Sequence, residues 1–111
     1  MEKNPDLAAL QANLGEIVDR LAQKQEEATD PAVIKALAIE IREVLFRVTT
    51  VQQLLFRQQT DRISRAIEQV NDARADLDKA IADIEKLNHF LGSISSFLGL
   101  VDKVLDVAKL I

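Results

Sequence analysis

The amino-acid sequence predicts an all-α protein, a four-helix up-and-down bundle whose helices meet along coiled-coil-like heptad seams. The composition supports this, because the 111 residues include only three Gly, two Pro and four Phe, with no Tyr or Trp. In addition, Leu, Ile and Val recur at alternating steps of three and four residues through most of the chain. A chain of this length should form a single helical domain, residues 1–111.

The first helix is expected at about residues 5–28. Asn4 can cap it, Pro5 suits the first helical turn, and Asp6 lies near the positive end of the helix dipole. Its apolar residues form a heptad seam of Leu7, Leu10, Leu14, Ile17 and Leu21.

The second helix, at about residues 31–58, begins with the same signal. Asp30 is the expected cap and Pro31 the first helical residue. The predicted seam consists of Ile34, Leu37, Ile41, Val44, Val48, Val51 and Leu55.

The third helix is expected at about residues 61–91, with Thr60 or Asp61 as its cap. Continuing the previous seam by seven residues from Leu55 reaches Arg62, whereas the apolar pattern resumes one residue later, at Ile63. Residues 57–62 contain no apolar side chain, so we interpret them as a turn. The alternative is one long helix spanning 31–91 in an oligomeric coiled coil.

The fourth helix is expected at about residues 94–110. We place its boundary at Gly92, where Ser93, Ser95 and Ser96 could supply caps. Its main apolar stripe is Phe90/Leu91, Ile94, Phe97/Leu98, Val101, Val104/Leu105, Ala108 and Ile111.

The composition argues against several classes of function. A net charge of −4 without aromatic stacking residues makes a nucleic-acid partner improbable, because Lys and Arg contacts to phosphate supply most of that affinity. No signal peptide is recognisable in the first residues, which favours a cytoplasmic location. Export by a route that reads no N-terminal signal would leave the same sequence.

The sequence predicts neither catalysis nor a cofactor or metal site. There is no Cys, and the one His, His89, has no serine motif to serve. Di-iron bundles need two Glu-x-x-His motifs, whereas Glu85 and His89 are four residues apart and no second His exists. The acidic residues between Asp72 and Glu85 alternate with Lys and Arg, as on a solvated helix face.

Two apolar residues of the second helix lie off its seam. At about 100° per residue, Phe46 and Ile39 are about 200–220° from Val44, on an otherwise polar side. Three interpretations remain: the fourth helix covers them, they contact a partner or a second copy, or they are tolerated surface residues.

The C-terminal segment, 90–111, has more apolar surface than one stripe requires, since Leu100 and Val107 lie beside that stripe. A membrane-spanning helix is improbable here, because the uncharged stretch from Phe90 to Val101 has only twelve residues. About 20 are needed to cross a bilayer. The segment either completes the core, within the bundle or between copies, or lies on a membrane surface.

We therefore expect a non-catalytic helical protein–protein interaction or assembly module that acts through apolar helix faces. Its expected contact residues are Ile39, Phe46, Phe97, Leu100 and Val107, with a protein partner or self-association. The alternative is a membrane-active protein, such as a subunit of a helical pore-forming or lipid-binding assembly. It would insert the helix of 90–111, with Gly92 as the hinge.

Overall fold

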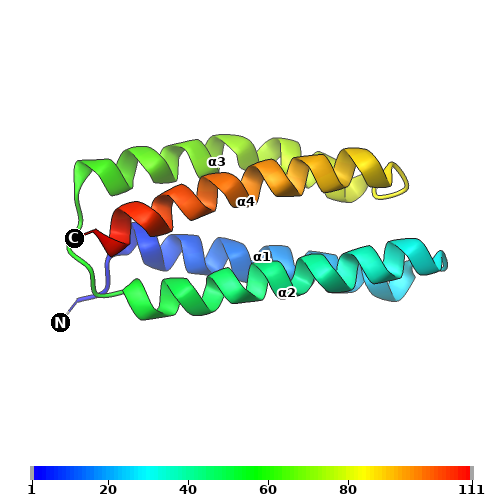
Figure 1. Ribbon diagram of the computed structural model, residues 1–111, viewed down its shortest axis with the longest axis horizontal. Coiled ribbons are helices and arrows are strands. Elements are labelled where there is room, and N and C mark those ends of the chain that lie inside the picture. The colour runs from blue at the N-terminus through cyan, green and yellow to red at the C-terminus, as the bar shows by residue number, and fades with distance from the viewer. Residues whose placement is uncertain (1, 111) are drawn as a thin grey trace.

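Four helices account for nearly all of residues 2–110, the part of the chain that the computed structural model describes (Figure 1). They are α1 (Pro5–Glu27), α2 (Pro31–Leu54), α3 (Asp61–Ala82) and α4 (Leu87–Lys109). No strand occurs among these residues. The predicted all-α four-helix bundle is confirmed.

Three of the four helices begin where short polar side chains cap them. Asn4 Oδ1 accepts hydrogen bonds from the backbone N–H groups of Asp6 and Leu7, at 3.0 and 3.1 Å. Asp30 accepts from the N–H of Ala32 at 2.9 Å, and Thr60 from that of Ile63 at 3.2 Å. These are the predicted caps, and each satisfies donors that an α-helix leaves without an internal partner.

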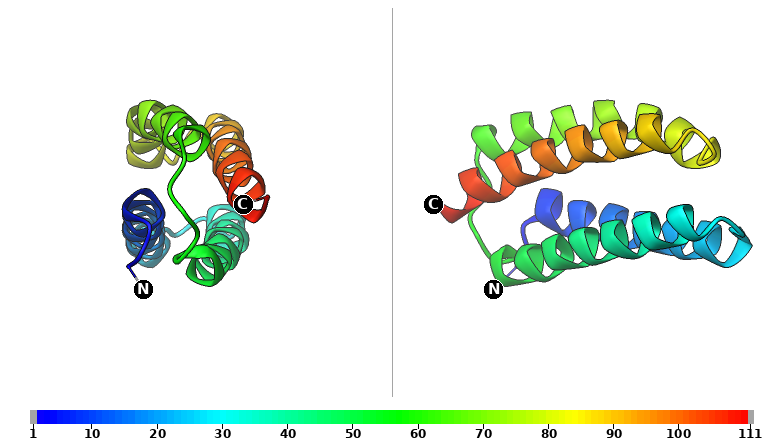
Figure 2. Two further views of the ribbon diagram at one scale, coloured as in Figure 1. Left: turned by 90° about the vertical axis from the view of Figure 1, so that its left-hand side faces the viewer. Right: turned by 45° about the vertical axis from the view of Figure 1, so that its right-hand side comes forward.

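The bundle consists of two antiparallel hairpins, α1 with α2 and α3 with α4, laid side by side (Figures 1 and 2). Helix α1 lies beside α3, and α2 lies beside α4; within residues 2–110, α2 and α3 do not touch. The segment 55–60 crosses the end of the bundle diagonally to join them, as the end view shows (Figure 2). Neighbouring helices therefore run antiparallel within a hairpin and parallel between hairpins.

The core is one cluster built from the inward stripes of all four helices. Every predicted seam residue of α1 is buried. In α2 the buried positions are Val33, Leu37, Val44, Val51 and Leu54, so the predicted seam is only partly right. Ile34 is exposed and Ile41 and Val48 are half-buried, because this side of α2 faces the edge of α1 rather than the bundle axis.

The boundary between the third and fourth helices was predicted wrongly. Helix α3 ends at Ala82 and α4 begins at Leu87, so the turn occupies residues 83–86. The turn forms without Gly or Pro, closed by a hydrogen bond of 3.0 Å from the N–H of Lys86 to the carbonyl oxygen of Asp83. The separate helices α2 and α3 also overturn the alternative of one helix spanning 31–91.

Gly92 lies inside α4, five residues after the first residue of that helix. Its backbone is helical, and a Cβ added there would meet no other atom within 4 Å. The predicted hinge was placed at Gly92 because a helix junction was expected there. That reason no longer holds, since α4 continues through this residue without interruption.

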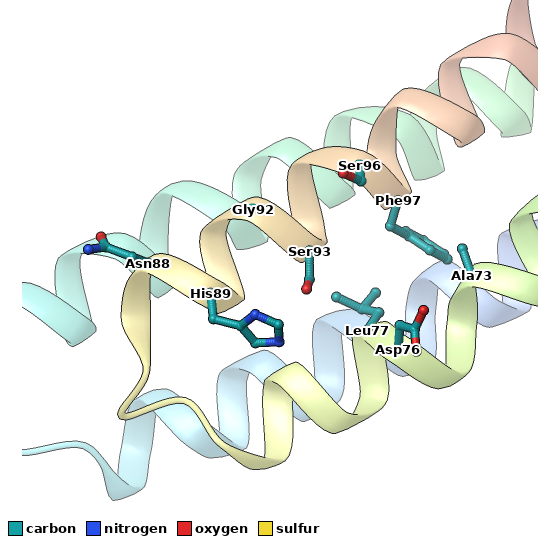
Figure 3. A pocket seen from close by; sticks show the side chains of 9 residues that line it. All are labelled: Ala73, Asp76, Leu77, Asn88, His89, Gly92, Ser93, Ser96 and Phe97. Carbon is teal, nitrogen blue, oxygen red and sulfur yellow. The ribbon is translucent and has the colours of Figure 1, made fainter.

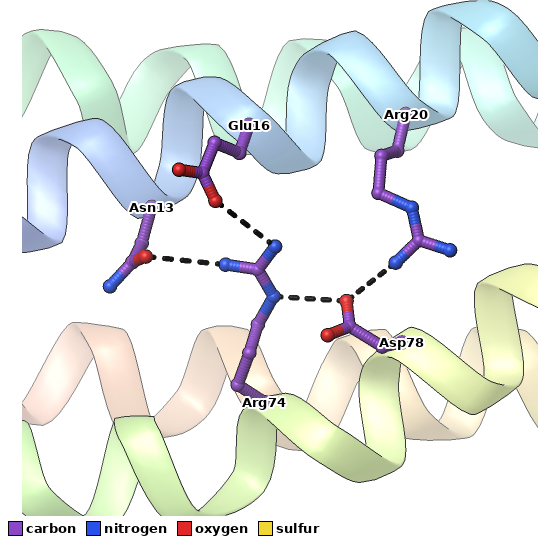
Figure 4. Close-up of polar contacts among 5 residues, drawn as sticks. All are labelled: Asn13, Glu16, Arg20, Arg74 and Asp78. Atoms are coloured by element: carbon purple, nitrogen blue, oxygen red, sulfur yellow. Dashed lines mark hydrogen bonds and ion pairs between the residues drawn. The ribbon is translucent and has the colours of Figure 1, made fainter.

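Arginine side chains bridge the two hairpins on both sides of the bundle. Arg74 of α3 reaches Asn13 and Glu16 of α1, and it also binds Asp78 of its own helix at 3.0 Å (Figure 4). Arg20 of α1 binds the same Asp78 at 2.6 Å. On the opposite side, Arg47 of α2 binds both carboxylate oxygens of Asp102 of α4, at 2.9 and 3.0 Å. The Arg47–Asp102 pair is bidentate, a geometry that fixes orientation as well as adding energy, so it favours the parallel alignment of α2 with α4.

Candidate interaction surface

Large apolar side chains are exposed almost entirely on α2 and the turn that follows it. Within residues 2–110, five of the six exposed large hydrophobic residues lie there: Ile34, Ile39, Leu45, Phe46 and Phe56. The sixth is Leu110, at the end of α4. Phe46 is 68% exposed and Phe56 51%, so neither side chain contributes much to the core. Concentration of exposed apolar residues on one element is typical of a contact surface.

These five residues form two edges along α2. Ile34 and Leu45 project within about 20° of Gln52, whose side chain binds Gln11 of α1, and Phe56 follows in the turn after α2. They therefore lie on the side of α2 nearest α1, and we call them the α1-side edge. Ile39 and Phe46 lie about 100° further round, towards α4.

The exposed charges beside these residues are mainly basic. Between residues 31 and 57 the exposed charged side chains are Lys35, Arg42, Glu43 and Arg57. The exposed surface of residues 31–57 is therefore mainly basic, although the net charge of the chain is −4. The combination of apolar and basic groups favours an acidic contact surface on whatever binds here.

The structure separates the five residues that the sequence proposed as contacts. Ile39 and Phe46 are exposed on α2, which rules out the interpretation that α4 covers them. Phe97 is 1% exposed and lies in the core, so its prediction as a contact residue is wrong. Leu100 and Val107 are half-buried, and Val107 lies beside Arg65 and Ala66 of α3. Only the α2 pair lies on the apolar surface described above.

Sequence reasoning missed Leu45, Phe56 and the exposure of Ile34. Leu45 is only about 100° from Val44 on the helix, half as far as Phe46, so its position was compatible with burial as well as with exposure. Ile34 fitted the heptad seam and was assigned to the core. Whether that flank of α2 is covered depends on the position of α1, which periodicity alone does not give.

A groove of about 520 Å³ between α3 and α4 holds the chemically suggestive side chains His89, Ser93 and Asp76 (Figure 3). His89 and Ser93 project from α4 toward α3, where Asp76 and Leu77 lie. No hydrogen bond joins the imidazole, the hydroxyl and the carboxylate among the described side chains. The amides beside Ser93 are committed to the helix, so they supply no oxyanion hole. The groove thus lacks an activated nucleophile.

Two properties of residues 2–110 bear on binding. No three His, Asp or Glu side chains there come together as a metal-ligand group. No helix in the same range combines the length and hydropathy needed to cross a bilayer.

Glu40 of α2 is a source of pH-dependent stability. Burial raises the pKa of its carboxyl group, the nearby Glu43 carboxylate raises it further, and Arg47 opposes both. Because the pKa is raised in the folded state, the stabilising contribution is present below the unfolded pKa and is lost as the pH rises through the folded pKa.

We therefore expect Glu40→Gln to increase the free energy of unfolding near neutral pH. The increase should disappear as the pH falls below 4.5, the unperturbed value. Denaturant unfolding at neutral pH and below pH 4.5 measures the free energy of unfolding. Glu68→Gln, at an exposed position of α3, is the matched control. A variant less stable than the native protein at neutral pH would mean that attraction to Arg47 dominates.

Comparisons of this chain with protein-family models, with curated proteins and with solved structures find no match. The case for a function therefore rests on the surface chemistry of the bundle, above all on the exposed apolar residues of α2.

Proposed function

We propose that this protein is a non-catalytic binding module that contacts other protein surfaces through the outer side of α2. The observation that supports this is the concentration of Ile34, Ile39, Leu45, Phe46 and Phe56 on one helix and its following turn. Helix α3 has no exposed large hydrophobic residue at all among its described positions. Apart from Leu110, the exposed large apolar residues within residues 2–110 are thus confined to α2 and the turn that follows it.

Folding does not account for these side chains. Helix α2 already supplies the core through Leu37, Val44 and Val51, each fully buried. Burying a further Leu, Ile or Phe in an interface is worth about 1.5–3 kcal/mol per side chain. Four of the five residues stand on a regular helix, so a partner would gain these contacts without first ordering a loop.

The membrane-active alternative requires α4 to leave the bundle. Its apolar residues, including Phe90, Phe97 and Val101, are buried against the other helices. Releasing them would open the core, and Gly92 lies within a continuous helix rather than at a helix junction.

Site-specific photo-crosslinking tests the binding function. A benzophenone amino acid placed at Phe46 or Leu45, in cells that make this protein, should give discrete crosslinked species on irradiation. The same group at Glu68, exposed on α3, is the control and should give none. Equal labelling from α2 and α3, or none from α2, would overturn the proposal.

Vesicle flotation separates the two functional classes. The intact chain should remain unfloated with both neutral and anionic vesicles, because its apolar tail is in the core. Flotation with either kind of vesicle would favour the membrane-active alternative.

A further inference from the structure

Helices α1 and α2 lie side by side and form one outer face of the bundle (Figure 2). This face carries large apolar residues on α2 and mainly small residues on α1. The large residues are those of the α1-side edge of α2: Ile34, Leu45 and Phe56. On α1 a second series with steps of four and three runs beside them: Ala8, Ala12, Gly15, Asp19, Ala22 and Glu26. All six are exposed or half-buried, and a Cβ at Gly15 would meet nothing within 4 Å.

Two contacts fix the register of α1 against α2 on this face. Gln11 Nε2 donates to Gln52 Oε1 at 2.6 Å, and Gln25 Nε2 donates to the carbonyl oxygen of Ile34 at 3.1 Å. Interpolation between these contacts places Asp19 level with Arg42. At the far end of the hairpin, Glu26 is within about one turn of Lys35.

The charges on this face are divided between its two helices. Asp19 and Glu26 lie on the α1 side, whereas Lys35 and Arg42 lie on the α2 side, and all four are exposed. None of these four makes an ion pair within the described part of the chain. Each is therefore available to a surface of opposite charge.

We propose that this face binds the same face of a second copy of the chain, across a two-fold axis parallel to the helices. The inference rests on the binding function proposed above and names its partner. Such an axis places α1 of one copy over α2 of the other. Each residue keeps the same position along the length of the bundle in both copies. The register between copies is then that of the hairpin itself, and each contact occurs twice.

This arrangement matches both charge and size. Arg42 meets Asp19 of the second copy, and Lys35 lies within about a turn of its Glu26. Leu45 lies near Gly15 of the second copy, and Phe56 near its Ala8, so large side chains oppose small ones. A two-fold axis across the helices would instead stack α1 on α1, with Asp19 and Glu26 on a like-charged surface.

The face is large enough for a stable dimer. Helices of 23 and 24 residues are about 35 Å long, and two of them are about 20 Å wide, which gives about 700 Å² per copy. A standard interface buries about 800 Å² per partner. Ile39 and Phe46 lie at the margin of this contact, since they line one surface depression with Arg42.

Charge exchange tests the dimer, with mass measured by sedimentation over a dilution series. The native chain should sediment at twice its 12.4 kDa. Arg42→Glu and Asp19→Arg should each raise the dimer dissociation constant by about tenfold or more, because each places like charges together twice. Both substitutions in one chain should restore the dimer.

Mixing the two single variants should also restore a dimer, now a heterodimer, because both contacts become attractive. Arg62→Glu and Asp72→Arg, at exposed positions of α3, are matched controls and should leave the native dimer unchanged. A chain that stays monomeric, or a dimer indifferent to both reversals, would overturn this inference. Crosslinks from Phe46 to another protein would then still support the binding function.

Discussion

Replacing Phe97 with Ala should lower the free energy of unfolding by about 3–5 kcal/mol. The phenyl ring is 1% exposed and belongs to the single core that all four helices share. Its removal loses the apolar transfer energy of the side chain and leaves a cavity that the surrounding helices fill only in part. Urea unfolding followed by far-ultraviolet circular dichroism measures the change, since the chain contains no Tyr or Trp.

Phe46→Ala is the matched control, because it removes the same atoms from a side chain that is 68% exposed. We expect a change of no more than about 0.5 kcal/mol. The pair of variants separates core residues from surface residues independently of any partner. Similar losses for both variants would contradict the placement of Phe46 on the surface.

Replacing Asn4 with Ala should cost about 2 kcal/mol, the upper end for loss of a helix cap. Asn4 is the one buried polar residue within residues 2–110. Its Oδ1 caps α1, its Nδ2 donates to the carbonyl oxygen of Arg57 at 3.2 Å, and its backbone N–H donates to that of Leu55 at 2.6 Å. The residue thus joins the start of α1 to the diagonal segment 55–60. Thermal and denaturant unfolding measure the loss.

Two controls separate the cap from the connection to the diagonal segment. Asn4→Asp keeps the capping acceptors but removes the donor to Arg57, so it should be intermediate in stability. Asp30→Ala removes a cap that is exposed and has one hydrogen bond, and should cost about 0.5–1 kcal/mol. If Asp30→Ala costs as much as Asn4→Ala, the connection to segment 55–60 adds nothing to the cap.

Local signals were sufficient for the helices with polar caps. Asn4–Pro5, Asp30–Pro31 and Thr60 mark helix starts because the capping oxygen and the helix lie within three residues of each other. The fourth start had no such signal, since Lys86 makes no side-chain cap hydrogen bond. The sequence therefore predicted this boundary at Gly92, whereas the turn lies at residues 83–86 and contains neither Gly nor Pro.

The contact surface could be predicted only in part. Ile39 and Phe46 were found because they break the helical period on a polar side of α2. Leu45 and Phe56 lie nearer the seam, where the same period is compatible with burial or exposure. Phe97 was misassigned for the converse reason: a tail rich in apolar residues can fill a core or cover a surface, and its sequence is the same in both cases.

By itself, the sequence determined the all-α class, most inward stripes and three helix starts, because these depend on side chains within a few turns of each other. Only the tertiary structure decided that α2 lies diagonal to α3 and which flank of α2 is exposed. It also decided the register of α1 against α2, which places Asp19 level with Arg42 along the hairpin. Those features depend on which helices become neighbours. Four amphipathic stripes can bury the same apolar area in more than one arrangement, and bridges such as Arg47–Asp102 and Arg20–Asp78 form only after the hairpins have docked.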